Sequence, residues 1–153
     1  MRAASKPKPA VILLAEDDRG DQELTRRALE EGKIHNDLHI VEDGEEALAY
    51  LFRRGKYQEP ASSPRPDLLL LDLNLPRVDG REVLERIRAD SKLRRMAVVV
   101  LTTSRQEEDI LRSYELGCNS FITKPVDMDQ FIRVIHALEE YWFQIVVLPP
   151  KTE

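Results

Sequence analysis

Short apolar runs alternate with amphipathic segments along most of the chain. Five such runs predict strands at 11–15, 39–41, 68–71, 97–101 and 120–123. Runs of this kind are typical of strands that are buried on both faces of a parallel sheet. Between them, apolar residues at helical spacing predict helices at about 21–31, 47–52, 80–87, 107–115 and 127–138. The alternation therefore predicts an α/β fold, a parallel sheet with helices on both sides.

The same periodicity predicts which helical faces are buried. In the first helix, Leu24, Ala28 and Leu29 share one face, which we expect to pack on the sheet. In the last helix, Phe131 belongs to the inner face. Residues 55–66 contain prolines, serines and a glycine, so we expect them to form a loop.

Polar residues follow four of the predicted strands at the point where each strand ends. Glu16 and Asp17 follow the first strand, Asp72 the third, Thr102 the fourth and Lys124 the fifth. The carboxyl ends of parallel strands meet at one edge of the sheet, which is where ligands bind in such folds. We therefore expect these five side chains to share one pocket.

The composition of this pocket indicates phosphoryl-transfer chemistry. Clustered carboxylates repel one another, and a hard divalent cation with oxygen ligands relieves the repulsion. We expect Mg²⁺, because it prefers one or two carboxylates, several waters and a phosphate. Thr102 and Lys124 can bind the oxygens of a transferring phosphoryl group. A carboxylate can itself form an acyl phosphate, and Asp72 has the central position.

Four motifs carry a resemblance to a known family. They are Leu14-Ala15-Glu16-Asp17-Asp18, Leu71-Asp72-Leu73-Asn74-Leu75-Pro76 followed by Asp79-Gly80, Leu101-Thr102-Thr103-Ser104, and Phe121-Ile122-Thr123-Lys124-Pro125. Over residues 10–140 the chain resembles the receiver domains of bacterial two-component response regulators. The resemblance implies a doubly wound, flavodoxin-like (βα)5 fold whose parallel five-stranded sheet has the order 2-1-3-4-5. Before it, we expect residues 1–9, with their alternating Lys and Pro, to be a disordered lead-in.

The resemblance also assigns roles to the acidic residues. Asp72 matches the aspartate that accepts a phosphoryl group from a phosphohistidine on a sensor histidine kinase. Asp17 matches the direct acidic ligand of Mg²⁺, and Glu16 matches its neighbour, which usually acts through water. Asp72 and the backbone carbonyl of Asn74 complete the implied metal ligands. Asp18 has no counterpart role, so we expect it to lie at the surface or to cap a helix.

Three further positions match the family's switch and catalytic residues. Thr102 matches the switch hydroxyl, Lys124 the lysine that pairs with the phosphoryl group, and Phe121 the aromatic switch position. The resemblance implies that Thr102 and Phe121 shift together on phosphorylation and change the surface of the domain. The domain would then be a phosphoacceptor that catalyses its own phosphorylation and dephosphorylation, rather than an enzyme with a separate substrate.

Two features narrow the resemblance within the family. These are the long loop at 55–66 and the apolar tail at 141–150. Together with the Thr102-Thr103-Ser104 triplet, they resemble those of stand-alone regulators that partner phytochrome-type sensor kinases. We expect no output domain after the last predicted helix, so either the signal leaves by protein contact or the domain serves as an intermediate in a relay or as a phosphate sink. The C-terminal extension at 141–153 is either packed on its own domain or part of a homodimer contact.

Composition restricts the partners and the compartment. The chain of 153 residues has a formal charge of −5, which argues against nucleic acid, because phosphate binding needs a basic patch. No run of apolar residues is long enough to predict a membrane span. A single cysteine, Cys118, fits a reducing compartment, so we expect a cytoplasmic protein in which this thiol is a small buried hydrophobe.

Two alternative functions remain open from the sequence. A degenerate receiver would bind partners without being phosphorylated, although every acceptor residue is present here. A haloacid-dehalogenase-type phosphatase also uses a strand-end aspartate, Mg²⁺, a Thr and a Lys. Such an enzyme needs a second aspartate two residues after the nucleophile as general acid, and Asn74 at that position cannot donate a proton in that way.

Overall fold

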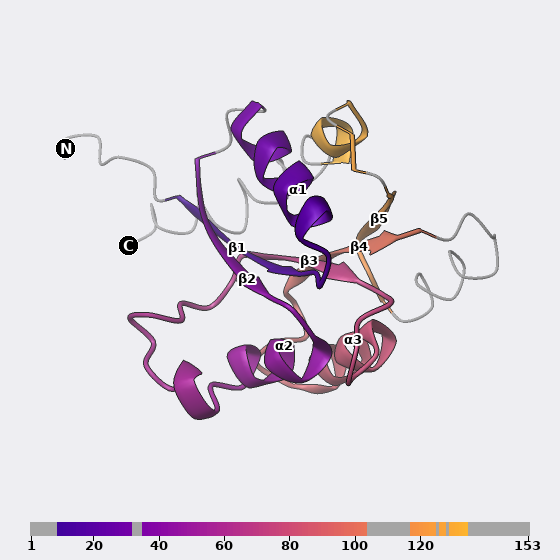
Figure 1. Cartoon of the computed structure of the whole chain (residues 1–153). Coiled ribbons are helices and arrows are strands. Elements are labelled where there is room, and N and C mark those ends of the chain that lie inside the picture. The colour runs from indigo at the N-terminus through magenta and orange to yellow at the C-terminus, as the bar shows by residue number, and fades with distance from the viewer. Residues whose placement is uncertain (1–8, 32–34, 104–116, 125, 128, 135–153) are drawn as a thin grey trace, which may run out of the picture.

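Five parallel strands form the centre of the molecule (Figure 1). The computed structural model describes residues 9–31, 35–103, 117–124, 126–127 and 129–134. The strands are β1 (Ala10–Ala15), β2 (Asn36–Val41), β3 (Leu68–Asp72), β4 (Ala97–Thr102) and β5 (Ser120–Thr123). They pair in the order β2-β1-β3-β4-β5, and every pairing is parallel. The predicted fold class and strand order are confirmed.

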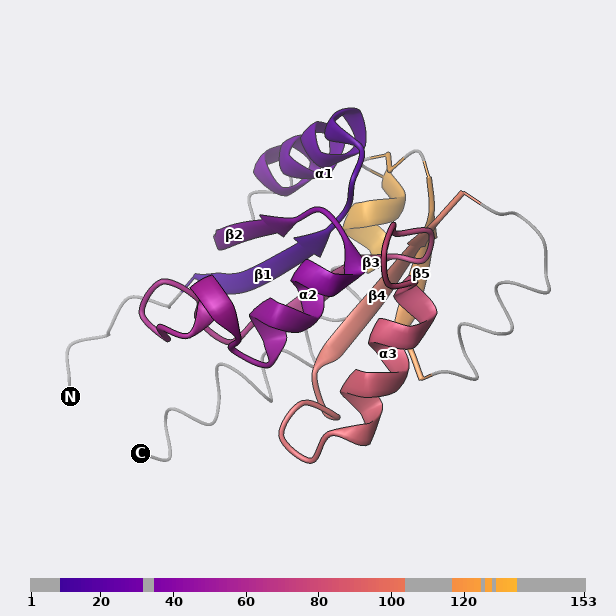
Figure 2. The same cartoon turned by 60° about the horizontal axis from the view of Figure 1, so that its bottom comes forward.

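Helices cover both faces of the sheet. They are α1 (Arg19–Glu31), α2 (Gly44–Leu51), the short 3₁₀ helix η1 (Gly55–Tyr57) and α3 (Gly80–Ala89), and residues 129–134 are also helical. In Figure 1, α1 and the helical residues 129–134 lie on one side of the sheet, and α2 and α3 on the other. Figure 2 shows α2 and α3 next to each other on their side. The predicted helix at 107–115 and the extension at 141–153 lie outside the described residues.

The core consists of two apolar layers, because neighbouring residues of a strand point to opposite faces of the sheet. Leu69 and Leu71 of β3 belong to the layer under α2 and α3. Leu68 and Leu70 belong to the layer under α1 and Phe131. All four leucines are fully buried, which explains why the central strands are uninterrupted apolar runs in the sequence.

The prediction for the buried face of α1 was wrong in one position. Ala28 and Leu29 are buried as expected, but Leu24 is 39% exposed. Thr25 is buried in its place, and its hydroxyl donates a hydrogen bond to the carbonyl of Asp21 at 3.0 Å. An α-helix turns about 100° per residue, so Leu24 lies roughly a quarter turn away from the middle of the buried face formed by Thr25, Ala28 and Leu29. A satisfied hydroxyl allows a polar residue to take the inner position.

The segment at 55–66 is more ordered than the loop that was predicted. It begins with η1, and two tyrosines attach the region to the domain. Tyr50 donates to the carbonyl of Pro64 at 2.8 Å, and Tyr57 donates to the carboxylate of Glu46. The two tyrosine rings also contact each other, with centroids 5.1 Å apart. These contacts hold the loop against α2.

The turn after β3 is packed too tightly for a side chain at its far end. A Cβ atom on Gly80 would lie 2.3 Å from the carbonyl oxygen of Asp72, well inside van der Waals contact. The carboxylate of Asp79 caps α3 by accepting from the N–H of Arg81 at 2.7 Å. The start of α3 is therefore fixed directly against the end of β3, where Asp72 lies.

Candidate functional site

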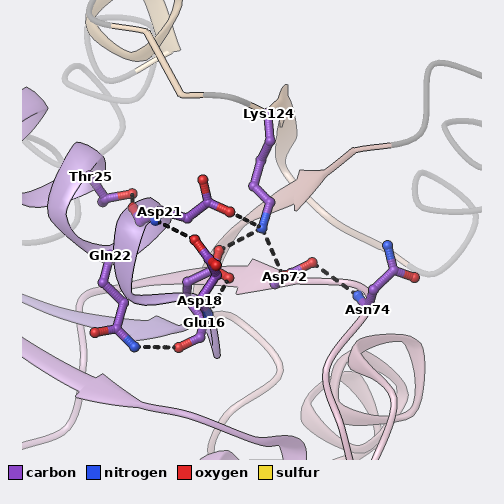
Figure 3. Close-up of polar contacts among 8 residues, drawn as sticks. All are labelled: Glu16, Asp18, Asp21, Gln22, Thr25, Asp72, Asn74 and Lys124. Atoms are coloured by element: carbon purple, nitrogen blue, oxygen red, sulfur yellow. Dashed lines mark hydrogen bonds and ion pairs between the residues drawn. The ribbon is translucent and has the colours of Figure 1, made fainter.

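Three of the five residues predicted to share a pocket are in direct contact at the carboxyl edge of the sheet. Lys124, which follows β5, donates to Glu16 Oε1 at 2.8 Å and to Asp72 Oδ2 at 2.9 Å (Figure 3). Glu16 follows β1, and Asp72 is the last residue of β3. Strands that are far apart in the sequence thus bring these three charged groups into direct contact.

The charges at this edge are withdrawn from water. Glu16 is fully buried, Asp72 is 3% exposed and Lys124 is 8% exposed. Burying ionised groups is costly unless they are paired and hydrogen-bonded. Here the two buried carboxylates share one ammonium group, so the pairing is close but leaves an excess of negative charge.

Three carboxylates are arranged as a metal ion would require. Ligand oxygens of Glu16, Asp17 and Asp72 lie within 4.8 Å of one another. Two of these residues are buried, and Asp17 is exposed. A hard cation such as Mg²⁺ or Mn²⁺ binds oxygen donors of this kind and keeps part of its coordination for water and phosphate. The donor set therefore fits a divalent cation that is accessible from solvent on the side of Asp17.

Asp72 is oriented by two donors. Its Oδ1 atom accepts a hydrogen bond from the backbone N–H of Asn74 at 3.0 Å, and its Oδ2 atom accepts from Lys124. The side chain of Asn74 itself is exposed. Each carboxylate oxygen of Asp72 thus has a partner, which sets the plane of the group before any substrate arrives.

Burial and charge shift the pKa values in this site. The pKa of Glu16 is raised to about 7, mainly by burial and also by the neighbouring charge of Asp72, although Lys124 and the N–H of Asp18 oppose the rise. Burial alone would lower the pKa of Lys124. Its hydrogen bonds to Glu16, Asp72 and Asp21 together outweigh burial and raise that pKa above its ordinary value. Lys124 therefore stays an ammonium cation at every physiological pH.

The first turn of α1 and the residue that caps it supply three side chains to this region. Asp18 accepts from the N–H of Asp21 at 2.8 Å and so caps the helix, one of the two roles expected for it. Asp21 lies 2.9 Å from Lys124 and is a member of the site that the sequence analysis missed. Gln22 donates to the backbone carbonyl of Glu16 at 2.8 Å. The available signal was an acidic residue in the first turn of the helix after β1, next to the strand-end acids.

The two predicted switch residues lie on the neighbouring strands β4 and β5. Thr102 ends β4, is 2% exposed, and its carbonyl accepts from the N–H of Lys124 at 2.7 Å. Phe121 in β5 is half-buried and packs against the apolar layer under α2 and α3. Cys118 is buried as predicted, and burial raises the pKa of its thiol.

Comparison with known proteins identifies the family. Residues 12–136 match the response regulator receiver domain family. The chain belongs to this family. It is 44% identical over 141 residues to the response regulator Rcp1 of Synechocystis sp., an alignment that covers 92% of this chain and 94% of Rcp1.

Solved structures of related receivers agree with this assignment. The bacteriophytochrome response regulator RtBRR has a TM-score of 0.78 and 45% identity, over 86% of this chain and 78% of that one. The phosphorylated cyanobacterial phytochrome response regulator RcpA has a TM-score of 0.74 and 43% identity, over 91% of this chain and 97% of that one. The Mn²⁺-bound form of Rcp1 matches at a TM-score of 0.74 over 90% of this chain and 97% of that one. The receiver described here is thus a homologue of phytochrome-associated response regulators.

A helix can cross a bilayer only if it is long and apolar enough. Among the described residues, no helix has this length and apolar character.

Proposed function

We propose that this receiver accepts a phosphoryl group on Asp72 from a phosphohistidine of a sensor histidine kinase, with Mg²⁺ bound beside it. The observation that supports the proposal is the contact of Lys124 with Asp72 inside a cluster of three carboxylates. Glu16, Asp17, Asp72 and the backbone carbonyl of Asn74 are the proposed metal ligands. A bound Mg²⁺ would neutralise charge on the transferring phosphoryl oxygens.

The protein's own residues account for the other requirements of the transfer. A carboxylate oxygen of Asp72 forms the new bond to phosphorus, while the phosphorus–nitrogen bond of the phosphohistidine breaks and the imidazole keeps the electron pair. Lys124 stabilises the charge on the phosphoryl oxygens with its ammonium group. The N–H of Asn74, 3.0 Å from Asp72 Oδ1, holds the carboxylate in a defined orientation. No general acid is needed at Asn74, which distinguishes this chemistry from the phosphatase alternative.

Thr102 and Phe121 are the proposed switch residues. Thr102 is nearly fully buried at the end of β4, and Phe121 is half-buried on the adjacent strand. We propose that the Thr102 hydroxyl binds the phosphoryl group and that Phe121 then changes its packing. A half-buried aromatic ring can gain buried apolar area by turning inward, whereas a fully buried ring cannot. The domain is a phosphoacceptor in this scheme, and it acts on no separate substrate.

Phosphorylation with a small phosphodonor tests the acceptor directly. Incubation with acetyl phosphate and Mg²⁺ should add about 80 daltons, the mass of one phosphoryl group, in intact-mass spectrometry. The Asp72→Asn variant should gain nothing. Asp67→Asn is the matched control, because Asp67 lies before the opposite end of β3, where it accepts from the N–H of Val11. No gain in the natural protein would favour the binding module that is never phosphorylated, and a gain that survives in Asp72→Asn would exclude Asp72 as the acceptor.

A phytochrome-type kinase is the proposed partner, because RtBRR and RcpA are named as phytochrome response regulators. The purified kinase should transfer labelled phosphate to this receiver faster than an unrelated histidine kinase does. Equal transfer rates from the two kinases would exclude a phytochrome-type kinase as the specific partner.

We also propose a cytoplasmic homodimer whose contact includes residues 141–153. Removal of these residues should give a monomer in sedimentation velocity. A truncated protein that still sediments as a dimer would exclude this role of the extension.

A further inference from the structure

Lys124 has a third carboxylate partner, in addition to Glu16 and Asp72. Its Nζ atom lies 2.9 Å from Asp21 Oδ2, the same distance as from Asp72 Oδ2, and 2.8 Å from Glu16 Oε1. Figure 3 shows Asp21 approaching the lysine from α1, whereas Asp72 approaches it from β3. An ammonium group has three N–H donors, so these three oxygens use its full capacity.

Asp21 differs from the other two partners because it is outside the group of carboxylates that would hold the metal. That group is Glu16, Asp17 and Asp72. A cation bound there attracts the same carboxylates that now accept from Lys124. When Asp72 bonds to phosphorus, the negative charge on its carboxylate is also lost. Asp21 is the partner whose contact with the lysine neither event removes.

The backbone around Asp21 is fixed on both sides. Its N–H donates to Asp18 at 2.8 Å, and its carbonyl accepts from the hydroxyl of the buried residue Thr25 at 3.0 Å. The side chain of Asp21 is 23% exposed, and that of Lys124 is 6% exposed. A carboxylate on a rigid first turn of helix can set the direction of a flexible lysine side chain.

We propose that Asp21 is a positioning residue for phosphoryl transfer, which orients the ammonium group of Lys124 toward the phosphoryl oxygens on Asp72. The inference rests on the proposed function of Asp72. Asp21 does not touch the reacting atoms and acts through Lys124. An acidic residue in the first turn also stabilises the helix, so the test has to separate orientation from stability and from charge.

Three variants make that separation. Asp21→Ala removes the contact, Asp21→Asn keeps an oxygen that can accept from Lys124 but has no charge, and Glu23→Ala removes the same charge from the same helix. Glu23 is exposed and pairs with Arg26 and Arg27 instead of Lys124. The phosphorylation rate with acetyl phosphate and Mg²⁺ is followed by quenching and intact-mass spectrometry, and thermal denaturation confirms that each variant is folded.

We expect Asp21→Ala to slow phosphorylation by about tenfold, the lower end of the range for a residue that orients another. Asp21→Asn should recover most of the rate, and Glu23→Ala should match the natural protein. If Asp21→Ala does not fold, Asp21→Ser replaces it, since serine is tolerated near helix starts and is too short to reach the lysine.

Other results overturn the inference. If Asp21→Ala is phosphorylated as fast as the natural protein, Lys124 does not need Asp21 to orient it. An Asp21→Asn variant as slow as Asp21→Ala means that charge matters and orientation does not. Faster phosphorylation in both variants means that Asp21 opposes the transfer. Failure of the proposed function is distinct from all of these, because the natural protein would then gain no phosphoryl group at all.

Discussion

Replacing Lys124 by methionine tests how the site balances its charges. Methionine keeps a flexible apolar stem of similar length but removes the ammonium group. The exposed fractions of the Lys124, Glu16 and Asp72 side chains are 6%, 0% and 4%, so water does not take over the lost pairing. The variant therefore leaves two buried carboxylates facing each other without a counter-ion.

The expected loss of stability follows from burial. Removing one partner of a buried ion pair costs about 3–5 kcal/mol, because the remaining charge stays buried and unpaired. The contact with Asp21, whose side chain is 23% exposed, adds at most about 1 kcal/mol. Glu16 can limit the loss by taking up a proton, since its pKa is already about 7. We therefore expect a loss near the lower end, about 3 kcal/mol, just above neutral pH.

The loss should depend on pH in a definite direction. A carboxyl group whose pKa in the folded state is raised contributes stability below its unfolded pKa and loses it as the pH rises through the folded value. In Lys124→Met the ammonium group no longer opposes the raised pKa of Glu16. The difference in stability between the variant and the natural protein should therefore be small at about pH 5 and grow toward about pH 8.

Urea denaturation in the presence of a chelator measures this difference at the two pH values. Lys92→Met is the matched control, because Lys92 is exposed and its N–H, rather than its side chain, makes the contact with Asp90. Adding Mg²⁺ should stabilise Lys124→Met more than the natural protein, since the ion supplies the missing positive charge. Equal midpoints for the variant and the natural protein at about pH 8, or a loss that is the same at both pH values, would refute this account.

Three further predictions concern the frame of the site and the loop beside it. Gly80→Ala should lower the free energy of unfolding by about 1–3 kcal/mol and slow phosphorylation, because the new Cβ would lie 2.3 Å from the carbonyl oxygen of Asp72. Gly20→Ala is the control, since its new Cβ would lie 3.2 Å from the nearest atom. Equal urea midpoints for the two variants would contradict this prediction. Tyr57→Phe should lose about 1–2 kcal/mol at neutral pH. Burial alone would raise the pKa of Glu46, but hydrogen bonds from Tyr57 and from the N–H of Glu42 outweigh burial and lower that pKa. The stability lost in Tyr57→Phe should therefore shrink as the pH falls below about 4.5, where Glu46 becomes protonated. A loss that does not depend on pH would contradict this prediction. Arg88→Met should cost about 2–4 kcal/mol by thermal or urea denaturation, because the carbonyls of Gly117, Arg94 and Met96 lose a charged donor at 2.8 Å, and an unchanged midpoint would show that water replaces it.

The sequence was sufficient to predict the sheet and the acidic cluster. Strand ends are recognisable because an apolar run stops at a charged residue, and parallel strands bring these ends to one edge whatever the details of packing. Glu16, Asp72 and Lys124 could thus be placed together from their positions alone. The strand order, in contrast, came from the resemblance, since no local pattern distinguishes one arrangement of buried parallel strands from another.

Contacts that depend on helix orientation could not be predicted in this way. Asp21 reaches Lys124 because α1 starts directly after Asp18, so its first turn lies at the carboxyl edge of the sheet, and periodicity does not encode how that turn is oriented. The exposure of Leu24 has the same origin. Helical spacing defines a stripe of apolar residues, but the side on which the helix rests decides which edge of the stripe meets solvent.

The charge balance at the sheet edge suggests why a metal ion should act before the phosphodonor. Glu16, Asp17, Asp21 and Asp72 contribute four formal negative charges, and Lys124 contributes one positive charge, which leaves −3 when all are ionised. A phosphodonor is itself an anion, so it meets a site that repels it. A divalent cation held by Glu16, Asp17 and Asp72 would reduce the formal charge to −1 and would supply a positive charge for the phosphate oxygens. The excess of carboxylates therefore predicts that phosphorylation depends on the metal, because the single ammonium group of Lys124 is already paired with three protein carboxylates.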